Sequence, residues 1–172
     1  MNQELNMRQN ASNWLEKHTQ TRREIIFPVP VSTALHQLKI AFASAITISN
    51  GFLMAKYKYT GEANDTGINV HFSVNTGHKL YYIMQGKLFP HPKGSHLVMT
   101  VKVKTPLLFF IAPLWLIFFA LYKQEAAFAI FASLFFILSY LVMLWHLNSA
   151  ANNVSSLIRK IIATSQSSFI IS

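Results

Sequence analysis

Apolar residues dominate the chain between residues 106 and 147, in two stretches separated by a short polar loop. The first stretch covers residues 106–122 and the second covers residues 128–147, which contain no Asp, Glu, Lys or Arg. Each is near the length that a helix needs to cross a hydrocarbon core of roughly 30 Å. The pattern predicts a transmembrane helical hairpin, and therefore an integral membrane protein.

Ahead of the hairpin, apolar and polar residues alternate with a period of two, which is typical of strands with one buried face. Residues 23–28 predict a short strand that ends at Pro28. Four further strands are predicted, and turns rich in Gly, Asn and Pro separate them: residues 52–59, 68–74, 80–89 and 97–103. Consecutive strands joined by short turns form an antiparallel meander.

Two segments show the helical period instead. Residues 33–45 carry one apolar stripe and follow Ser32, a predicted N-cap, and we expect this helix to cover one face of the meander. After the second span, five aliphatic residues share one face of a predicted amphipathic helix: Val154, Leu157, Ile158, Ile161 and Ile162. This stripe lies either in the headgroup region, on the domain, or on a second subunit. We take its residues as candidates for partner contact.

These elements predict an α+β membrane protein in four parts. A polar segment (1–22) precedes a cytoplasmic α+β domain (23–104), which consists of a small antiparallel β-meander with one packed helix. A two-helix transmembrane hairpin (105–148) and an amphipathic C-terminal tail (149–172) follow.

The distribution of charge predicts the orientation in the membrane. Lys+Arg number 15 against 6 Asp+Glu, and the first residues lack the apolar core of a signal peptide. The positive-inside rule then places both termini in the cytoplasm, with residues near Ser95 and Ser165 inside and Gln124 outside. The candidates for the membrane interface are Lys102, Lys104, Tyr122, Trp145, His146, Arg159 and Lys160.

The lipid bilayer explains the basic balance more simply than nucleic acid does, so we expect no nucleic-acid partner. The outward lysines are expected to share one face of the sheet: Lys56, Lys58, Lys87, Lys102 and Lys104.

Residues suited to catalysis are sparse. The chain has no Cys, its histidines lack metal-ligand spacing, and it contains no nucleophile elbow, Walker loop or dinucleotide fingerprint. Glu62 and Asp65 fall in a predicted turn, where acidic residues have a conformational role. We expect no enzymatic activity, no cofactor and no metal.

Three short motifs carry a family resemblance: Tyr59-Thr-Gly61, Gly86-Lys-Leu-Phe-Pro90 and Gly94-Ser-His-Leu97. With the paired apolar helices that follow, the chain resembles an uncharacterised bacterial family of small two-helix membrane proteins with an N-terminal cytoplasmic β-rich domain. The resemblance implies this architecture and a location in the bacterial inner membrane, and it implies no activity. The last motif also resembles the hairpin of helix-grip lipid-binding folds, although no long helix clasping the sheet is expected before the spans.

Three functions fit this pattern. The first is a non-enzymatic, membrane-anchored binding or accessory module that docks a membrane protein partner or its own copies as a homo-oligomer. The second is an oligomeric pore-forming or membrane-perturbing effector that the cytoplasmic domain controls. The third is binding of lipid or another apolar ligand between helix and sheet. The uncharged spans favour the first function over the second, and the small domain disfavours the third.

Overall fold

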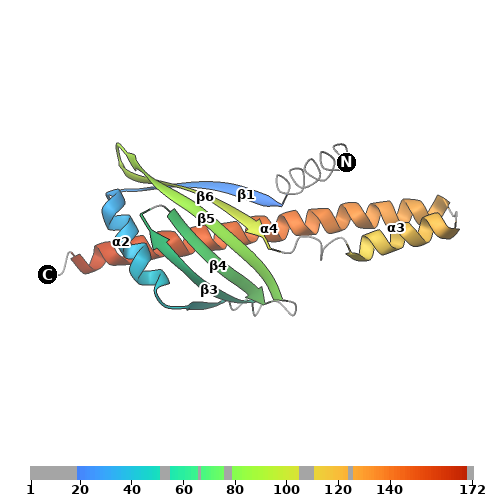
Figure 1. Ribbon diagram of the computed structural model, residues 1–172, viewed down its shortest axis with the longest axis horizontal. Helices are drawn as coiled ribbons and strands as arrows, with labels where there is room; N and C mark the ends of the chain where they lie inside the picture. Colours follow the sequence, from blue (N-terminus) through green and yellow to red (C-terminus); the bar gives the residue numbers. More distant parts are fainter. Residues whose placement is uncertain are drawn as a thin grey trace, which may run out of the picture.

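Six strands form one antiparallel sheet in the order β1-β6-β5-β4-β3-β2 (Figure 1). The computed structural model describes residues 19–50, 55–65, 67–75, 79–104, 111–123 and 126–169. The strands are β1 (Gln20–Phe27), β2 (Ile46–Asn50), β3 (Ala55–Asn64), β4 (Gly67–Asn75), β5 (Lys79–His91) and β6 (Gly94–Val103). The predicted meander is confirmed as β3 to β6. Of the predicted polar segment, residues 1–18 lie outside the described residues and residues 20–22 belong to β1.

The two edge strands differ from the sequence prediction. β1 returns from the start of the chain and pairs along its whole length with β6, from Gln20 opposite Lys102 to Phe27 opposite Ser95. β2 was not predicted, because five residues are too few for alternation to be distinguished from chance. Its pairing with β3 places Ile46 opposite Tyr59.

The β5–β6 turn is fastened to the end of β1 by close backbone packing. Gly94 has a φ of +127°, a conformation that side chains other than glycine rarely adopt. A Cβ atom at this position would collide with the backbone of Phe27, Pro28 and Val29. The turn therefore depends on a glycine here.

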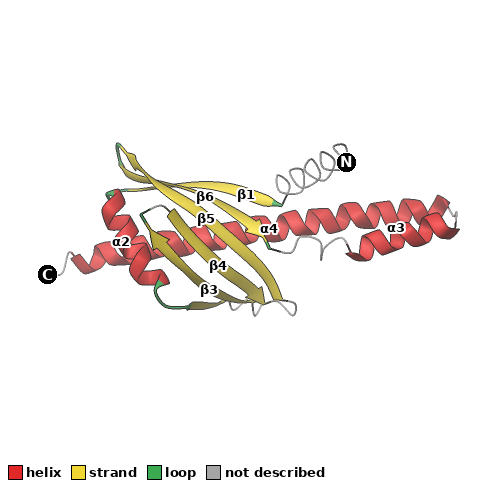
Figure 2. Cartoon of the chain, in the orientation of Figure 1, coloured by secondary structure: helices red, strands yellow, loops and turns green. Residues whose placement is uncertain are grey.

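The helix α2 (Val31–Phe42) lies against the sheet, as predicted, but its ends differ (Figure 2). Its N-cap is Pro30 and has no capping side chain, so the prediction of a Ser32 cap was wrong. The first turn closes instead through the N–H of Ala34, which donates to the carbonyl of Pro30 at 3.0 Å. Leu38 and Phe42 of the predicted stripe are buried.

The second apolar stretch and the predicted tail are one continuous helix, α4 (Ala126–Phe169), of 44 residues. No helix end therefore falls at the boundary predicted between residues 148 and 149. The N-terminal half of α4 packs against α3 (Ile111–Lys123), and its C-terminal half crosses one face of the sheet (Figure 1). The long helix that helix-grip folds place on their sheet is thus present, but it follows the apolar hairpin.

The hydrophobic core lies between the sheet and the two helices that cover it. The buried residues of the C-terminal half of α4 belong to this core: Leu147, Ala150, Ala151, Val154, Leu157, Ile158 and Ile162, with Ile161 partly buried against them. The five residues that we took as candidates for partner contact therefore pack on the domain of their own chain. The domain includes residues far beyond its predicted end at 104.

In the half of the molecule that α3 and the first part of α4 form, large apolar side chains are exposed rather than buried. Among the described residues, one helix is long and apolar enough to cross a membrane by length and composition, the Ile130–Thr164 part of α4. α3 has 13 residues, about 20 Å at ~1.5 Å per residue, and residues 106–110 of the predicted first span lie outside the described residues. Large apolar side chains are exposed along both helices, among them Trp115, Phe118, Ile130, Phe131, Leu134, Leu138, Leu141 and Trp145.

Candidate functional site

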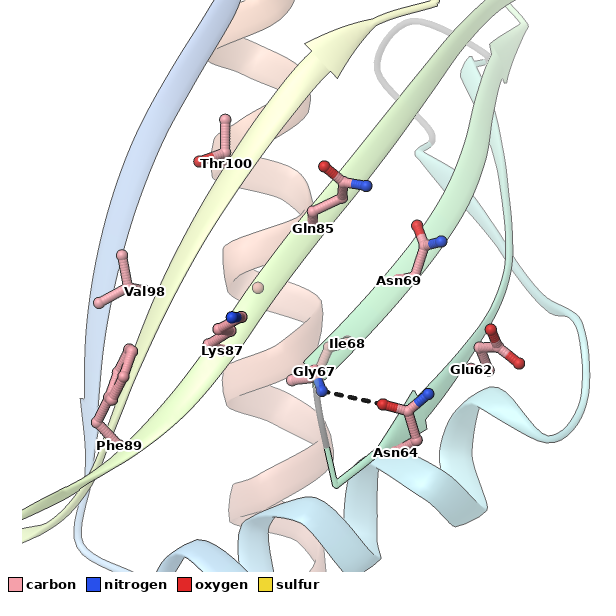
Figure 3. A pocket seen from close by; sticks show the side chains of 11 residues that line it. Glu62, Asn64, Gly67, Ile68, Asn69, Gln85, Lys87, Phe89, Val98 and Thr100 are labelled. Atoms are coloured by element: carbon pink, nitrogen blue, oxygen red, sulfur yellow. Dashed lines mark hydrogen bonds between the residues drawn. The ribbon is translucent and has the colours of Figure 1, made fainter.

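The face of the sheet opposite α2 and α4 carries a polar surface that the described helices leave uncovered (Figure 3). Alternation explains the division, because successive strand residues point to opposite faces. On β4, for example, Ile68, Val70, Phe72 and Val74 are buried, whereas the residues between them are half-buried or exposed. We call this surface the open face.

A row of polar side chains crosses five strands at the middle of the open face. The pairing register places Glu62 of β3 beside Asn69 of β4, and then Gln85, Thr100 and Arg22 on β5, β6 and β1. We call it the polar row. Neighbouring strands are about 4.8 Å apart, so the acidic end and the basic end of the row are roughly 19 Å apart. An acid–base pair must lie within hydrogen-bond reach, so these two ends cannot act together in proton transfer.

All members of the polar row except Arg22 line a hollow of this face that has a volume of about 540 Å³. Figure 3 shows Gln85, Asn69 and Lys87 on adjacent strands around it. At one end of the hollow, Asn64 Oδ1 accepts the N–H of Gly67 at 2.9 Å and closes the β3–β4 turn. The Oδ1 atom of Asn69 is buried and has no hydrogen-bond partner. The hollow thus offers hydrogen-bond donors and acceptors that could contact the polar groups of a binding partner.

Polar side chains also attach α4 to two strands of the sheet, β1 and β3. On β1, Arg23 donates hydrogen bonds to Asn148 Oδ1 and, at 3.4 Å, to Asn152 Oδ1. On β3, the Tyr57 hydroxyl accepts a hydrogen bond from Asn153 Nδ2 at 3.0 Å. Sequence patterns did not identify these contacts, although three Asn residues within six positions of one helix were an available signal.

A stack of aromatic rings lies beneath α4. Tyr57, Tyr59, Phe72 and Tyr82 follow one another with ring centroids 6.3, 5.3 and 5.1 Å apart. Burial raises the pKa of Tyr82 to about 12 and also raises the pKa of Tyr59. Both phenols therefore stay protonated at neutral pH, so neither supplies a phenolate base.

A groove between α4 and the β2–β3 edge, lined in part by Tyr57, Asn153 and Lys160, has a volume of about 260 Å³. Pockets for drug-sized ligands have volumes of roughly 300–1,000 Å³ and mostly apolar walls. The groove is smaller than this range and has a lysine and an amide at its rim. Its size and lining do not favour the binding of a lipid chain.

The residues predicted for the membrane interface lie in three separate places. Trp145 and His146 are adjacent on α4, with ring centroids 5.0 Å apart, and the hollow beside Trp145 is also lined by Gln20, the pairing partner of Lys102. Tyr122 is exposed near the other end of the hairpin. Arg159 and Lys160 are exposed about 21 Å beyond Trp145 along the axis of α4. The structure therefore does not bring these two cations together with the others.

The lysines predicted to share one face do so. Lys56 and Lys58 alternate with the buried Tyr57 and Tyr59 on β3, and Lys102 lies between the buried Val101 and Val103 on β6. Lys104 and Lys58 line a common hollow, and Lys87 lines the larger one.

Two histidines lie close together at the β5–β6 turn. The rings of His91 and His96 have centroids 6.1 Å apart, and His96 Nε2 lies 3.3 Å from a carboxylate oxygen of Glu24. Glu24 is also paired with Arg22 at 3.0 Å. In the part of the chain that the structure describes, no group of three or more His, Asp or Glu residues could hold a metal ion.

Comparisons with known proteins add little to this description. No family model matches the chain, and no curated protein matches it. A crystal structure of protein CV1439 from Chromobacterium violaceum is similar at 10% sequence identity with a TM-score of 0.36; the match covers 49% of this chain and 79% of that chain. A likeness of this extent carries no argument about fold or function.

Proposed function

We propose that this protein is a non-enzymatic, membrane-anchored binding and assembly module of the bacterial inner membrane, with both termini in the cytoplasm. The single observation that carries the proposal is the change of environment along α4. From Ile130 to Trp145 its large apolar side chains are largely exposed, and from Leu147 onward its apolar side chains are buried in the domain core. Such a helix needs an apolar environment for its first half and a folded domain for its second.

The length of the exposed half supports a membrane anchor. From Ala126 to Trp145 the helix covers about 29 Å, close to the roughly 30 Å of a hydrocarbon core. Trp145 then lies where interfacial aromatic residues are enriched. The apolar α3 packs against this half, as the other helix of the predicted hairpin would.

The continuity of α4 also gives the module a defined geometry. The same helix is anchor and core element, and Arg23 and Tyr57 hold it on two strands of the sheet. The domain therefore cannot rotate freely about a linker. The open face is presented to its partners at a fixed angle to the membrane, which suits a binding or assembly role.

The topology is open to a labelling test, because the chain has no Cys and single cysteines are unambiguous. Ser95, the position that the sequence suggested, is fully buried, so the exposed Lys93 in the same turn replaces it. In spheroplasts, a membrane-impermeant thiol reagent is expected to modify Gln124→Cys. It should modify Lys93→Cys and Thr164→Cys only after the membrane is permeabilised. Modification of Lys93→Cys from outside would overturn the proposed orientation.

Self-association through the hairpin is the second expectation. Trp115 and Phe118 of α3 are 71% and 67% exposed. Their rings are arranged edge-to-face, with centroids 6.4 Å apart. Aromatic and other apolar side chains on one helix face offer packing area to a second copy within the bilayer. In mild detergent the protein mass should exceed that of one chain, and the double substitution Trp115→Ala/Phe118→Ala should shift it toward the monomer. Lys93→Ala, in the β5–β6 turn, serves as the control, and a monomeric mass in every detergent tested would exclude assembly.

A further inference from the structure

The outward side chains of the sheet change in charge from one end of the open face to the other. The register defines rows that cross the strands, and the row of Glu24, Val98 and Lys87 and the polar row beside it both carry carboxylates. The next rows toward the hairpin contain His71 and Lys102, then Lys58 and Tyr81, then Lys56. The described side chains of these last rows, with Lys104 beside Tyr81, include four lysines and no Asp or Glu. We call Lys56, Lys58, Lys102 and Lys104 the basic end.

Two of these lysines flank a hollow with hydroxyl groups in its wall. The hollow has a volume of about 290 Å³, and its lining includes Lys58, Lys104, Ser73 and Tyr81. The N–H of Lys104 donates to the carbonyl of Tyr81 at 2.9 Å, which fixes the chain where it leaves the sheet. Ammonium groups beside hydroxyl donors form the environment that phosphate oxygens prefer.

The basic end lies at the level where α4 leaves the domain. Gln20, which pairs with Lys102, lines a hollow of about 380 Å³ together with Leu144, Trp145 and Asn148 of α4. In Figure 1, β4 and β6 both end on the side of the sheet from which the hairpin extends. The row of Lys102 is therefore at the height of Trp145, the residue that marks the edge of the apolar segment.

We propose that the basic end docks on the anionic phospholipid headgroups of the membrane in which the hairpin is anchored. The inference rests on the proposed function, because it requires the apolar half of α4 to lie in that membrane. The attraction between lysines and anionic headgroups extends about one Debye length, about 8 Å at physiological ionic strength. The lysine rows lie nearest to the headgroups, whereas the rows that contain Glu62 and Glu24 lie about 7 Å and about 13 Å farther along the strands than the row of Lys102, at ~3.3 Å per residue. The result is a domain held on the membrane surface, with the polar row left open toward the cytoplasm.

Lipid-dependent quenching in nanodiscs tests the contact with the full chain. Thr60→Cys, on the row of Lys102, carries an environment-sensitive fluorophore, and the nanodiscs contain headgroup-spin-labelled lipid as quencher. The matched control is Lys93→Cys in the turn at the far end of β6, about 30 Å from Lys102 at ~3.3 Å per residue.

Quenching at Thr60→Cys should be about twofold stronger with phosphatidylglycerol present than in phosphatidylcholine alone, and added salt should reduce it. The charge-removing pair Lys58→Gln/Lys104→Gln should bring it to the level seen in phosphatidylcholine. The label at Lys93→Cys should respond to none of these changes.

Two kinds of failure are distinguishable. If the protein is extracted from vesicles by alkaline carbonate, it is not anchored, and the proposed function fails together with this inference. If it stays in the bilayer but the quenching at Thr60→Cys is the same in both lipids, or is unchanged by Lys58→Gln/Lys104→Gln, the headgroup contact alone is overturned.

Discussion

Replacing Ile158 with glutamate is expected to remove most of the stability of the domain. Ile158 is fully buried in the core between α4 and the sheet. Truncating such a side chain to alanine costs about 2–5 kcal/mol. A carboxylate at this position adds the cost of an unpaired buried charge, and the total approaches the 5–15 kcal/mol that stabilises a typical domain. Thermal unfolding in detergent, followed by circular dichroism, should show a strongly lowered or absent transition.

The matched control is Ser156→Glu, two residues earlier on the exposed side of the same helix. Its carboxylate points to water and has Lys160 one turn away. The free energy of unfolding should therefore change by less than about 0.5 kcal/mol. If both glutamates behave alike, the stripe does not face a protein core. If Ile158→Glu changes only membrane attachment, with the unfolding of the domain unaffected, the stripe lies on lipid.

Replacing Ser149 with proline should have the second largest effect on stability, because it puts a helix-breaking residue in the interior of α4. The same substitution tests whether α4 is continuous at this position. Ser149 lies inside the continuous α4, between the apolar half and the half that covers the sheet. A proline in a helix interior removes one backbone hydrogen bond, clashes with the preceding turn and costs about 3 kcal/mol or more. The resulting kink would also misplace Asn148 and Asn152 relative to Arg23, which bonds to both.

If the helix were instead interrupted at the predicted start of the tail and a new helix began near residue 149, proline would stand in its first turn, where it is well tolerated. The melting temperature in detergent therefore discriminates between the two descriptions. We expect Ser149→Pro to lower it by several degrees or more and Ser149→Ala to leave it nearly unchanged or slightly higher. A stable Ser149→Pro protein would show that the helix is interrupted at this point.

The limits of the sequence prediction are clearest at residues 148–153. Three Asn residues here interrupt the apolar pattern, and Asn has a weak helix propensity because its side chain competes for backbone hydrogen bonds. A boundary between two helices was the natural local interpretation. The amides instead face β1 and β3, where Arg23 and Tyr57 bond to them. These tertiary partners lie about a hundred residues away, so no local window could include them.

The candidate site was predictable in part. The alternation of β3 to β6 placed the lysines on one face, because a strand has a period of two whatever it pairs with. The polar row was not predictable, because it depends on which residue of each strand lies opposite which residue of the next. Register brings Glu62, Asn69 and Gln85 side by side, and a slip of one residue would have reversed the faces of a whole strand.

By itself, the sequence determined the features that depend on composition and short-range periodicity: the apolar hairpin segment, strands β3 to β6, helix α2, and the amphipathic stripe from Val154 to Ile162. These follow from local backbone geometry and from the burial of apolar side chains, which leave a periodic record in the chain. Only the tertiary structure decided that β1 closes the sheet beside β6 and that the stripe covers this sheet rather than lipid or a partner. It also decided that the exposed apolar segment and the helix that covers the sheet are one continuous helix. These outcomes depend on which distant surfaces meet, and an apolar stripe is equally suited to any apolar surface until the fold supplies one.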